Sequence, residues 1–175
     1  MSSDFNGRWT IDLENSTVWD AQKQRHVPDK VGAEIITIHV ENGVQDYEVL
    51  YGDAPTFRMG YVSRYDDPTW VPYQVREVTN VPPEGLEEGT SRFKERINAA
   101  RGHGYRDLDV GKNYALVRTV SGDRRTHYRL AADPITREVM YVMPRRLADD
   151  GNSYVATILQ NDGTVFRVRR FVRIG

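Results

Sequence analysis

Apolar and polar residues alternate with a period of two along most of this chain. Ile36, Ile38 and Val40, for example, are separated by polar residues. Because successive side chains of a strand point to opposite faces, this pattern is typical of β-strands with one buried face. Short turn sequences separate the alternating runs, at Asn42-Gly43, Ser121-Gly122-Asp123 and Asn161-Asp162-Gly163. The pattern predicts nine or ten antiparallel strands joined by short turns.

A meander of this many strands has two edges that must be protected from pairing with other chains. Closing the sheet into a barrel removes both edges. The fold class that we predict is therefore all-β, a closed antiparallel up-and-down barrel of about eight to ten strands. The chain has 175 residues, the length of one domain, and no linker divides it. We expect residues 1–175 to form a single small-molecule-binding barrel domain.

Residues 81–112 interrupt the predicted strands. The segment opens with Val-Pro-Pro at 81–83, and Phe93, Ile97 and Ala100 recur at helical spacing before Gly102. Glycine commonly follows the last turn of a helix. We expect one short helix over residues 92–101, and we interpret residues 81–112 as a lid-like insertion at one end of the barrel.

Composition and the lack of certain motifs exclude several classes of protein. The chain has 24 Lys and Arg against 25 Asp and Glu, for a net charge of −1, which argues against a nucleic-acid or membrane-surface partner. No cysteine is present, so thiol catalysis and iron–sulfur clusters are excluded. The four histidines lack metal-ligand spacing, and no nucleotide-binding or serine-hydrolase motif occurs. We expect no metal and no cofactor.

The amino-terminal sequence, MSSDFNGRWTID, lacks the basic start and apolar run of a secretory signal. No stretch approaches the roughly 18–20 apolar residues that cross a bilayer. We expect a cytoplasmic protein and leave open whether it forms a homodimer.

The residues Asn6-Gly7-Arg8-Trp9, directly before the first strand, resemble the G-x-W opening of lipocalins and related calycins. In that family the tryptophan packs at the closed end of the barrel, under an arginine of the last strand. The resemblance implies that Arg170 or Arg173 has this structural role here. The second lipocalin motif, T-D-Y, is absent. The resemblance therefore implies a calycin-like barrel and no particular family within it.

Tyrosines are concentrated on the strand faces that we expect to point inward. A buried phenol needs a hydrogen-bond partner for its hydroxyl group. Inward phenols are therefore consistent with a cavity that holds water or a ligand carrying oxygen atoms, or else with a belt of tyrosines that fills the barrel. The residues that we assign to substrate binding are Tyr47, Tyr61, Trp70, Tyr73, Tyr128 and His39.

The candidate catalytic residues are Tyr51, Tyr65, Arg118 and His127. If the strand face that carries Arg118 points inward, its guanidinium needs a carboxylate from the protein or from a ligand. The alternative is that the opposite face, with Ala115 and Val117, is the buried one. His127 is flanked by arginines that would lower its pKa and keep it neutral, as a general base requires, although it could also be an exposed strand residue.

These residues support three hypotheses about function. The first is a cofactor-independent lyase, isomerase or cyclase that acts on a small aromatic, carbonyl or carboxylate compound through Tyr, Arg and His acid–base chemistry. The second, alternative hypothesis is a non-catalytic carrier or sensor of a small hydrophobic or aromatic ligand. The third, an RNA- or protein-binding surface on the arginine-rich strand 167–173, is disfavoured by the net charge. We favour the enzyme by a thin margin.

Overall fold

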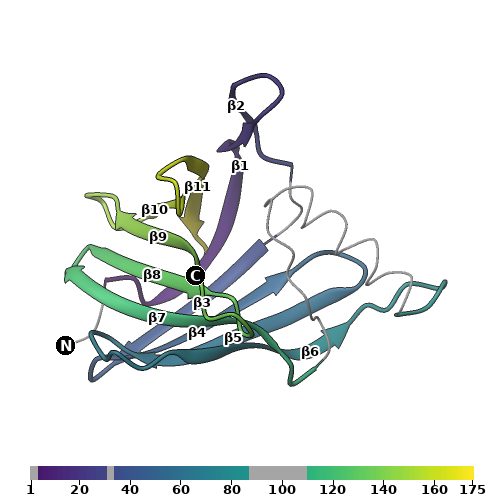
Figure 1. The fold of residues 1–175 in the computed structure, drawn as a ribbon, viewed down its shortest axis with the longest axis horizontal. Helices are drawn as coiled ribbons and strands as arrows, with labels where there is room; N and C mark the ends of the chain where they lie inside the picture. Colours follow the sequence, from purple (N-terminus) through teal and green to yellow (C-terminus); the bar gives the residue numbers. More distant parts are fainter. Residues whose placement is uncertain (1–3, 31–33, 87–109) are drawn as a thin grey trace.

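The computed structural model describes residues 4–30, 34–86 and 110–175. Its strands are β1 (Gly7–Asp20), β2 (Arg25–Pro28), β3 (Glu34–Glu41), β4 (Val44–Tyr51), β5 (Thr56–Arg64), β6 (Val71–Thr79), β7 (Asn113–Asp123), β8 (Thr126–Ala132), β9 (Val139–Leu147), β10 (Ser153–Gln160) and β11 (Val165–Arg173). From β3 to β11 each strand pairs with the next, and β1 pairs with both β3 and β11. The predicted closed antiparallel barrel is confirmed, with ten strands in the ring and β2 added to β1 outside it (Figure 1).

Strand β1 serves both the barrel and a hairpin that projects from it. Its first residues pair with β3 and β11, Thr17 and Val18 pair with both β11 and β2, and Trp19 and Asp20 pair with β2. The register with β11 shifts between Asp12 and Thr17, where the Ser16 hydroxyl donates to the Asp12 carbonyl at 2.6 Å. Such an irregularity bends a strand and increases its twist. The β1–β2 hairpin consequently extends away from the barrel wall (Figure 1).

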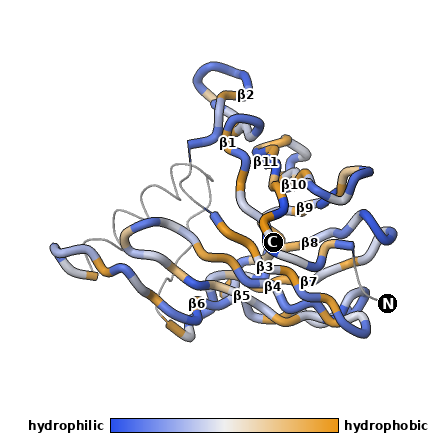
Figure 2. The backbone as a smooth tube through the Cα atoms, turned by 180° about the vertical axis from the view of Figure 1, so that it is seen from behind, coloured by the Kyte–Doolittle hydropathy of each residue, from blue (hydrophilic) through white to orange (hydrophobic). Residues whose placement is uncertain are grey.

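The alternation along the strands separates the barrel interior from its outer surface. On β3, Ile36, Ile38 and Val40 are buried while His39 is exposed, and hydropathy changes along the strands in the same way (Figure 2). The β3–β4 turn at Asn42-Gly43 has positive φ angles of 50° and 77°, which this hairpin type requires. The period of two thus predicts the element type and the buried face of this strand.

One predicted turn is displaced in the structure. Residues 121–123 belong to β7, and the chain reverses at Arg124-Arg125 instead. Gly122 lies beneath the ring of Tyr128, where an added Cβ would lie 2.8 Å from Cε2 of that ring. The glycine at this position therefore permits close packing within the hairpin and does not form its turn.

Trp9 closes one end of the barrel, as the G-x-W resemblance implies. It is fully buried, and the guanidinium carbon of Arg173 lies 4.1 Å from the centre of its ring. Arg170, the other candidate, points away and forms an ion pair with Asp12 at 3.7 Å. The structure therefore assigns the closing arginine to Arg173. Gly7 has a φ of 139°, and a Cβ there would lie 2.5 Å from Nη1 of Arg173.

No helix among the residues that the structure describes is long and apolar enough to cross a membrane. The predicted helix over 92–101 lies outside the described residues, as does most of the lid-like insertion 81–112. Residues 81–86 and 110–112 are the described ends of that insertion.

Candidate functional site

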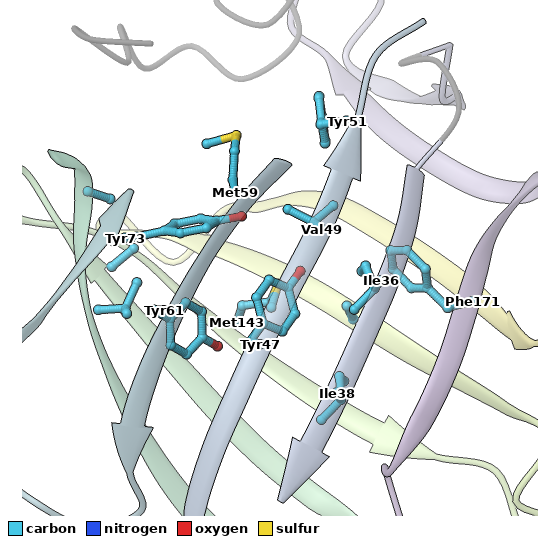
Figure 3. Packing of buried hydrophobic residues seen from close by; sticks show 14 of the residues in the cluster. Ile36, Ile38, Tyr47, Val49, Tyr51, Met59, Tyr61, Tyr73, Met143 and Phe171 are labelled. Atoms are coloured by element: carbon cyan, nitrogen blue, oxygen red, sulfur yellow. The ribbon is translucent and has the colours of Figure 1, made fainter. Parts of the chain in front are cut away.

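A small cavity of about 20 Å³ lies inside the barrel. A space of this size holds about one water molecule. Its wall is formed by Glu34, Ile36, Tyr47, Tyr51, Met59, Tyr73, Tyr114, Arg129, Met143, Arg145, Tyr154, Ala156, Ile158, Arg169 and Phe171. Figure 3 shows part of this wall, where the rings of Tyr47 on β4 and Tyr73 on β6 lie on the same inner surface as Ile36 of β3. The interior is therefore closely packed, and it combines apolar side chains with phenols and guanidinium groups.

Three of the predicted substrate-binding tyrosines form one cluster in this interior. Tyr47 and Tyr61 are register partners on β4 and β5, and their rings stack at 4.9 Å (Figure 3). The ring of Tyr73, from β6, meets both edge-on. Burial raises the pKa of Tyr47 to about 12, so its hydroxyl group stays protonated near neutral pH. Tyr51 also lines the cavity and lies on the same face of β4 as Tyr47, further along the strand.

Two arginines from neighbouring strands enter the same cavity. Arg129 of β8 pairs in register with Met143 of β9, which places Arg145 diagonally opposite it on the same inner face. Both guanidinium carbons lie near the ring of Tyr47, at 5.2 Å for Arg129 and 5.6 Å for Arg145. Contact with an aromatic face stabilises a cation, but it does not neutralise the charge.

Neither of these two arginines has a carboxylate partner among the described residues. Arg129 donates through Nη2 to the hydroxyl of Tyr141 at 3.1 Å, and Arg145 donates through Nη2 to Oε1 of Gln45 at 3.2 Å. Nε and Nη1 of both side chains are buried without a hydrogen-bond partner, as is the hydroxyl of Tyr154. Buried donors without partners are costly, so this part of the interior is suited to an anionic acceptor.

The other two buried arginines are fully balanced by carboxylates. Arg167 forms an ion pair with Asp29 at 2.9 Å, and Arg169 contacts Asp29 at 3.3 Å and Glu34 at 2.6 Å. Both arginines are buried on the inner face of β11. The hypothesis of an external basic surface on strand 167–173 is therefore wrong at these two positions, because their charges lie inside and are neutralised there.

A hydrogen-bond chain joins Arg145 to His127 at the Trp9 end of the barrel. Oε1 of Gln45 accepts from Arg145 and, at 2.9 Å, from the hydroxyl of Tyr61. Nε2 of Gln45 donates to the hydroxyl of Tyr65 at 2.5 Å, and that hydroxyl lies 2.7 Å from Nδ1 of His127. In the neutral ring of His127, Nδ1 accepts from the Tyr65 hydroxyl or donates to it, depending on which ring nitrogen carries the proton.

The environment of His127 favours that neutral form. Burial and the nearby Arg145 cation lower its pKa to about 4, against weaker opposition from aspartates. Phe5 packs on its ring at 4.4 Å. His127 is buried, Tyr65 is partly buried, and the two are hydrogen-bonded to each other, but neither lines the cavity.

The remaining predicted site residues lie away from the cavity. Arg118 is on the outer face of β7, where Nε donates to the carbonyl of Asp67 at 3.0 Å, and the buried face is the alternative one, with Ala115 and Val117. Tyr128 and His39 occupy outward positions on β8 and β3, and Trp70 precedes β6. Of the two alternatives left open for Arg118, the structure shows the outward one, and Tyr128 and His39, assigned to substrate binding from the sequence, also point outward.

Sequence reasoning missed the two arginines that dominate the cavity. Arg129 alternates in phase with Ala131, and Arg145 alternates in phase with Tyr141 and Met143, so the pattern itself carried a signal. Arg118 is also in phase with apolar residues and yet lies on the outer face, so this pattern marks a candidate inward cation and does not by itself identify one. The described residues contain no group of three or more His, Asp or Glu side chains that could hold a metal ion.

The closed ring, the Trp9–Arg173 closure and the inward polar cluster define a calycin-like barrel. No protein-family model and no curated protein sequence matches the chain. Among solved structures, the fold is similar to that of a Schistosoma mansoni fatty acid binding protein in complex with arachidonic acid, with a TM-score of 0.54 and 10% sequence identity. The likeness covers 99% of this chain and 98% of that chain, and it is a likeness of fold.

Proposed function

We propose that this protein is a non-catalytic carrier or sensor of a small amphipathic ligand, which binds inside the barrel with its anionic group between Arg129 and Arg145. The observation that supports the proposal most directly is the pair of buried guanidinium groups with unpartnered Nε and Nη1 atoms. An anionic group would accept from these donors, and the apolar wall around Ile158 and Phe171 would receive the rest of the ligand.

The position of the acid–base groups favours the carrier over the cofactor-independent enzyme. General acid–base catalysis needs a titrating group within hydrogen-bond reach of the substrate. Tyr65 and His127 bond to each other outside the cavity, and Arg118 lies on the outer face. Tyr51 does line the cavity, so a phenol is available to orient a ligand there. A similar barrel in the fatty acid binding protein holds arachidonic acid, which agrees with a carrier in this fold.

Isothermal titration calorimetry with octanoate and octanol tests the proposal, because the two ligands share a chain and differ in charge. We expect octanoate to bind at least tenfold more tightly to the wild-type protein. Arg129→Met and Arg145→Met should each weaken octanoate binding by roughly 10–100-fold, since hydrogen bonds to charged groups contribute about 1.5–3 kcal/mol. Arg146→Met is the matched control, because Arg146 is exposed on the outer face of β9.

The ligand-free variants provide a second measurement that separates binding from folding. Replacing a buried, unpaired cation by an apolar side chain of similar length is often neutral or stabilising. We therefore expect Arg129→Met and Arg145→Met to keep or raise the free energy of unfolding while they lose affinity. Equal binding of octanol and octanoate, or no binding of octanoate up to millimolar concentration, would overturn the proposal.

A further inference from the structure

We propose that the preferred anionic group is a doubly charged phosphoryl group, as in a phosphate monoester. This inference rests on the proposed function and specifies the ligand class for the same site. It is carried by three observations on the barrel interior: the balance of buried charges, the number of unpartnered donors, and the placement of the two arginines next to each other.

The buried charges do not cancel within the described part of the chain. The buried arginines are Arg129, Arg145, Arg167 and Arg169, and the buried carboxylates are Asp29 and Glu34. Both carboxylates are taken up by the pair on β11, so the two positive charges of Arg129 and Arg145 remain uncompensated. A monoanion would leave one of these charges without compensation, whereas a dianion neutralises both. Uncompensated charge in a dry interior is costly, which favours the dianion.

The free donors also match a phosphoryl group better than a carboxylate. Nε carries one N–H and Nη1 carries two, so the four unpartnered nitrogens offer about six N–H groups. The hydroxyl of Tyr154 adds a further unpartnered donor in the cavity wall. A carboxylate presents two oxygens with about four acceptor sites, whereas a phosphate monoester presents three strongly accepting oxygens.

The two guanidinium groups are positioned to bind one ligand together. Arg129 and Arg145 lie diagonally across β8 and β9, and both contact the ring of Tyr47. Guanidinium groups bind phosphoryl oxygens in a bidentate manner, which two adjacent arginines can do on different edges of one group. The cavity of about 20 Å³ must widen to admit it, because this volume holds only about one water molecule.

Titration calorimetry with octyl phosphate, octyl sulfate and octanoate tests this inference on the full-length protein. Octyl phosphate and octyl sulfate are both tetrahedral, but only the phosphate takes a second negative charge, with a pKa near 6. At pH 8 we expect octyl phosphate to bind at least tenfold more tightly than either monoanion. Between pH 8 and pH 5 its affinity should fall about tenfold, while that of octyl sulfate should stay constant.

Several titratable groups of the protein face the two arginines. They are the phenols of Tyr47, Tyr61, Tyr65, Tyr73, Tyr141 and Tyr154, the imidazole of His127 and the carboxylate of Glu34. Any change in the protonation of these groups would affect the affinity for octyl sulfate as well, so octyl sulfate serves as the control for them.

Arg129→Met should reduce the preference for octyl phosphate over octyl sulfate to less than threefold, and Arg146→Met should leave this preference unchanged.

The outcomes distinguish this inference from the proposed function. Equal affinity for all three anions, with octanol weaker, would overturn the phosphoryl preference and leave the anion-binding carrier intact. Absence of binding by every anion would overturn both.

Inorganic phosphate, titrated alone and as a competitor of octyl phosphate, identifies the source of the phosphoryl group. Binding of inorganic phosphate with the affinity of octyl phosphate would indicate a site for a small phosphate compound, with no contribution from the alkyl chain.

Discussion

At the scale of single residues, the four buried arginines of the barrel interior form two pairs that differ in their partners. Arg167 and Arg169 are held by Asp29 and Glu34, so removal of one carboxylate would leave these two buried cations with a single one of these carboxylates between them. Arg129 and Arg145 have phenol and amide partners instead. The first pair is therefore a structural element of the fold, and the second is the part of the interior that a ligand would complete.

His127 makes the stability of the protein depend on pH in a defined direction. Its pKa is about 4 in the folded state and about 6.5 in an unfolded chain. Above pH 6.5 both states hold neutral histidine, and as the pH falls toward 4 the unfolded state binds the proton first. The stabilisation by the neutral ring is therefore present above pH 6.5 and is lost between pH 6.5 and 4.

We expect the His127→Asn variant to remove this part of the pH dependence. Asparagine supplies an oxygen near the position of Nδ1, so the Tyr65 hydroxyl keeps an acceptor. Relative to the variant, the wild-type protein should lose about 2 kcal/mol of unfolding free energy between pH 7 and pH 4.5. Urea unfolding at several pH values measures the difference. The same pH slope in both proteins would show that His127 is not the responsible group.

At the scale of elements, the closure of β1 against β11 depends on a glycine. The guanidinium of Arg173 donates to the carbonyls of Asp4, Asn6 and Gly151, and it lies over Trp9. This group passes so close to Gly7 that no side chain fits there without displacing it. The G-x-W sequence therefore combines a backbone that allows close approach with an aromatic face for the same arginine.

Gly7→Ala should destabilise the barrel by more than its backbone conformation alone explains. Gly163→Ala is the matched control, since Gly163 also has positive φ but has no atom within 4 Å of its added Cβ. Positive φ at a non-glycine residue costs about 1–2 kcal/mol. Thermal unfolding should show a larger loss for Gly7→Ala, because it also disturbs Arg173. Equal losses in the two variants would mean that Arg173 moves aside without cost.

At the scale of the whole molecule, the barrel wall is closed and the cavity described above is small. The ring has no free edge between β1 and β11, and the cavity holds about one water molecule. A ligand with an alkyl chain therefore needs more room than this state offers. Side chains in the wall, Met143 and Tyr73 among them, must change position before or during binding.

This packing predicts that ligand association is limited by opening of the barrel. In stopped-flow measurements the observed rate for octanoate should reach a plateau as its concentration rises, instead of increasing in proportion to concentration as in simple bimolecular association. Met143→Ala should raise the plateau rate while costing about 2–4 kcal/mol of stability. Met140, which only borders the core, provides the control variant Met140→Ala. A linear rise to the highest concentration would contradict the requirement for opening.

Local sequence pattern by itself determined the fold class of this protein. The period of two and the Asn42-Gly43 turn depend only on residues that are close in the chain, and they predict strands and a hairpin that the structure contains. The G-x-W opening predicted the buried Trp9 under an arginine of the last strand. Alternation also grouped Tyr47 and Tyr51 on one face, which is the inner one.

Only the tertiary structure decided which face of the arginine-bearing strands points inward. Alternation states which residues share a face, but a face that mixes arginine with apolar residues does not differ enough in hydropathy to identify the buried one. The decision depends on partners far along the chain: Gln45 for Arg145, 100 residues away, and Asp29 for Arg167, 138 residues away. A buried cation is stable only when it contacts polar groups, and here those groups come from residues far along the chain. The candidate site could therefore be identified only from the tertiary structure.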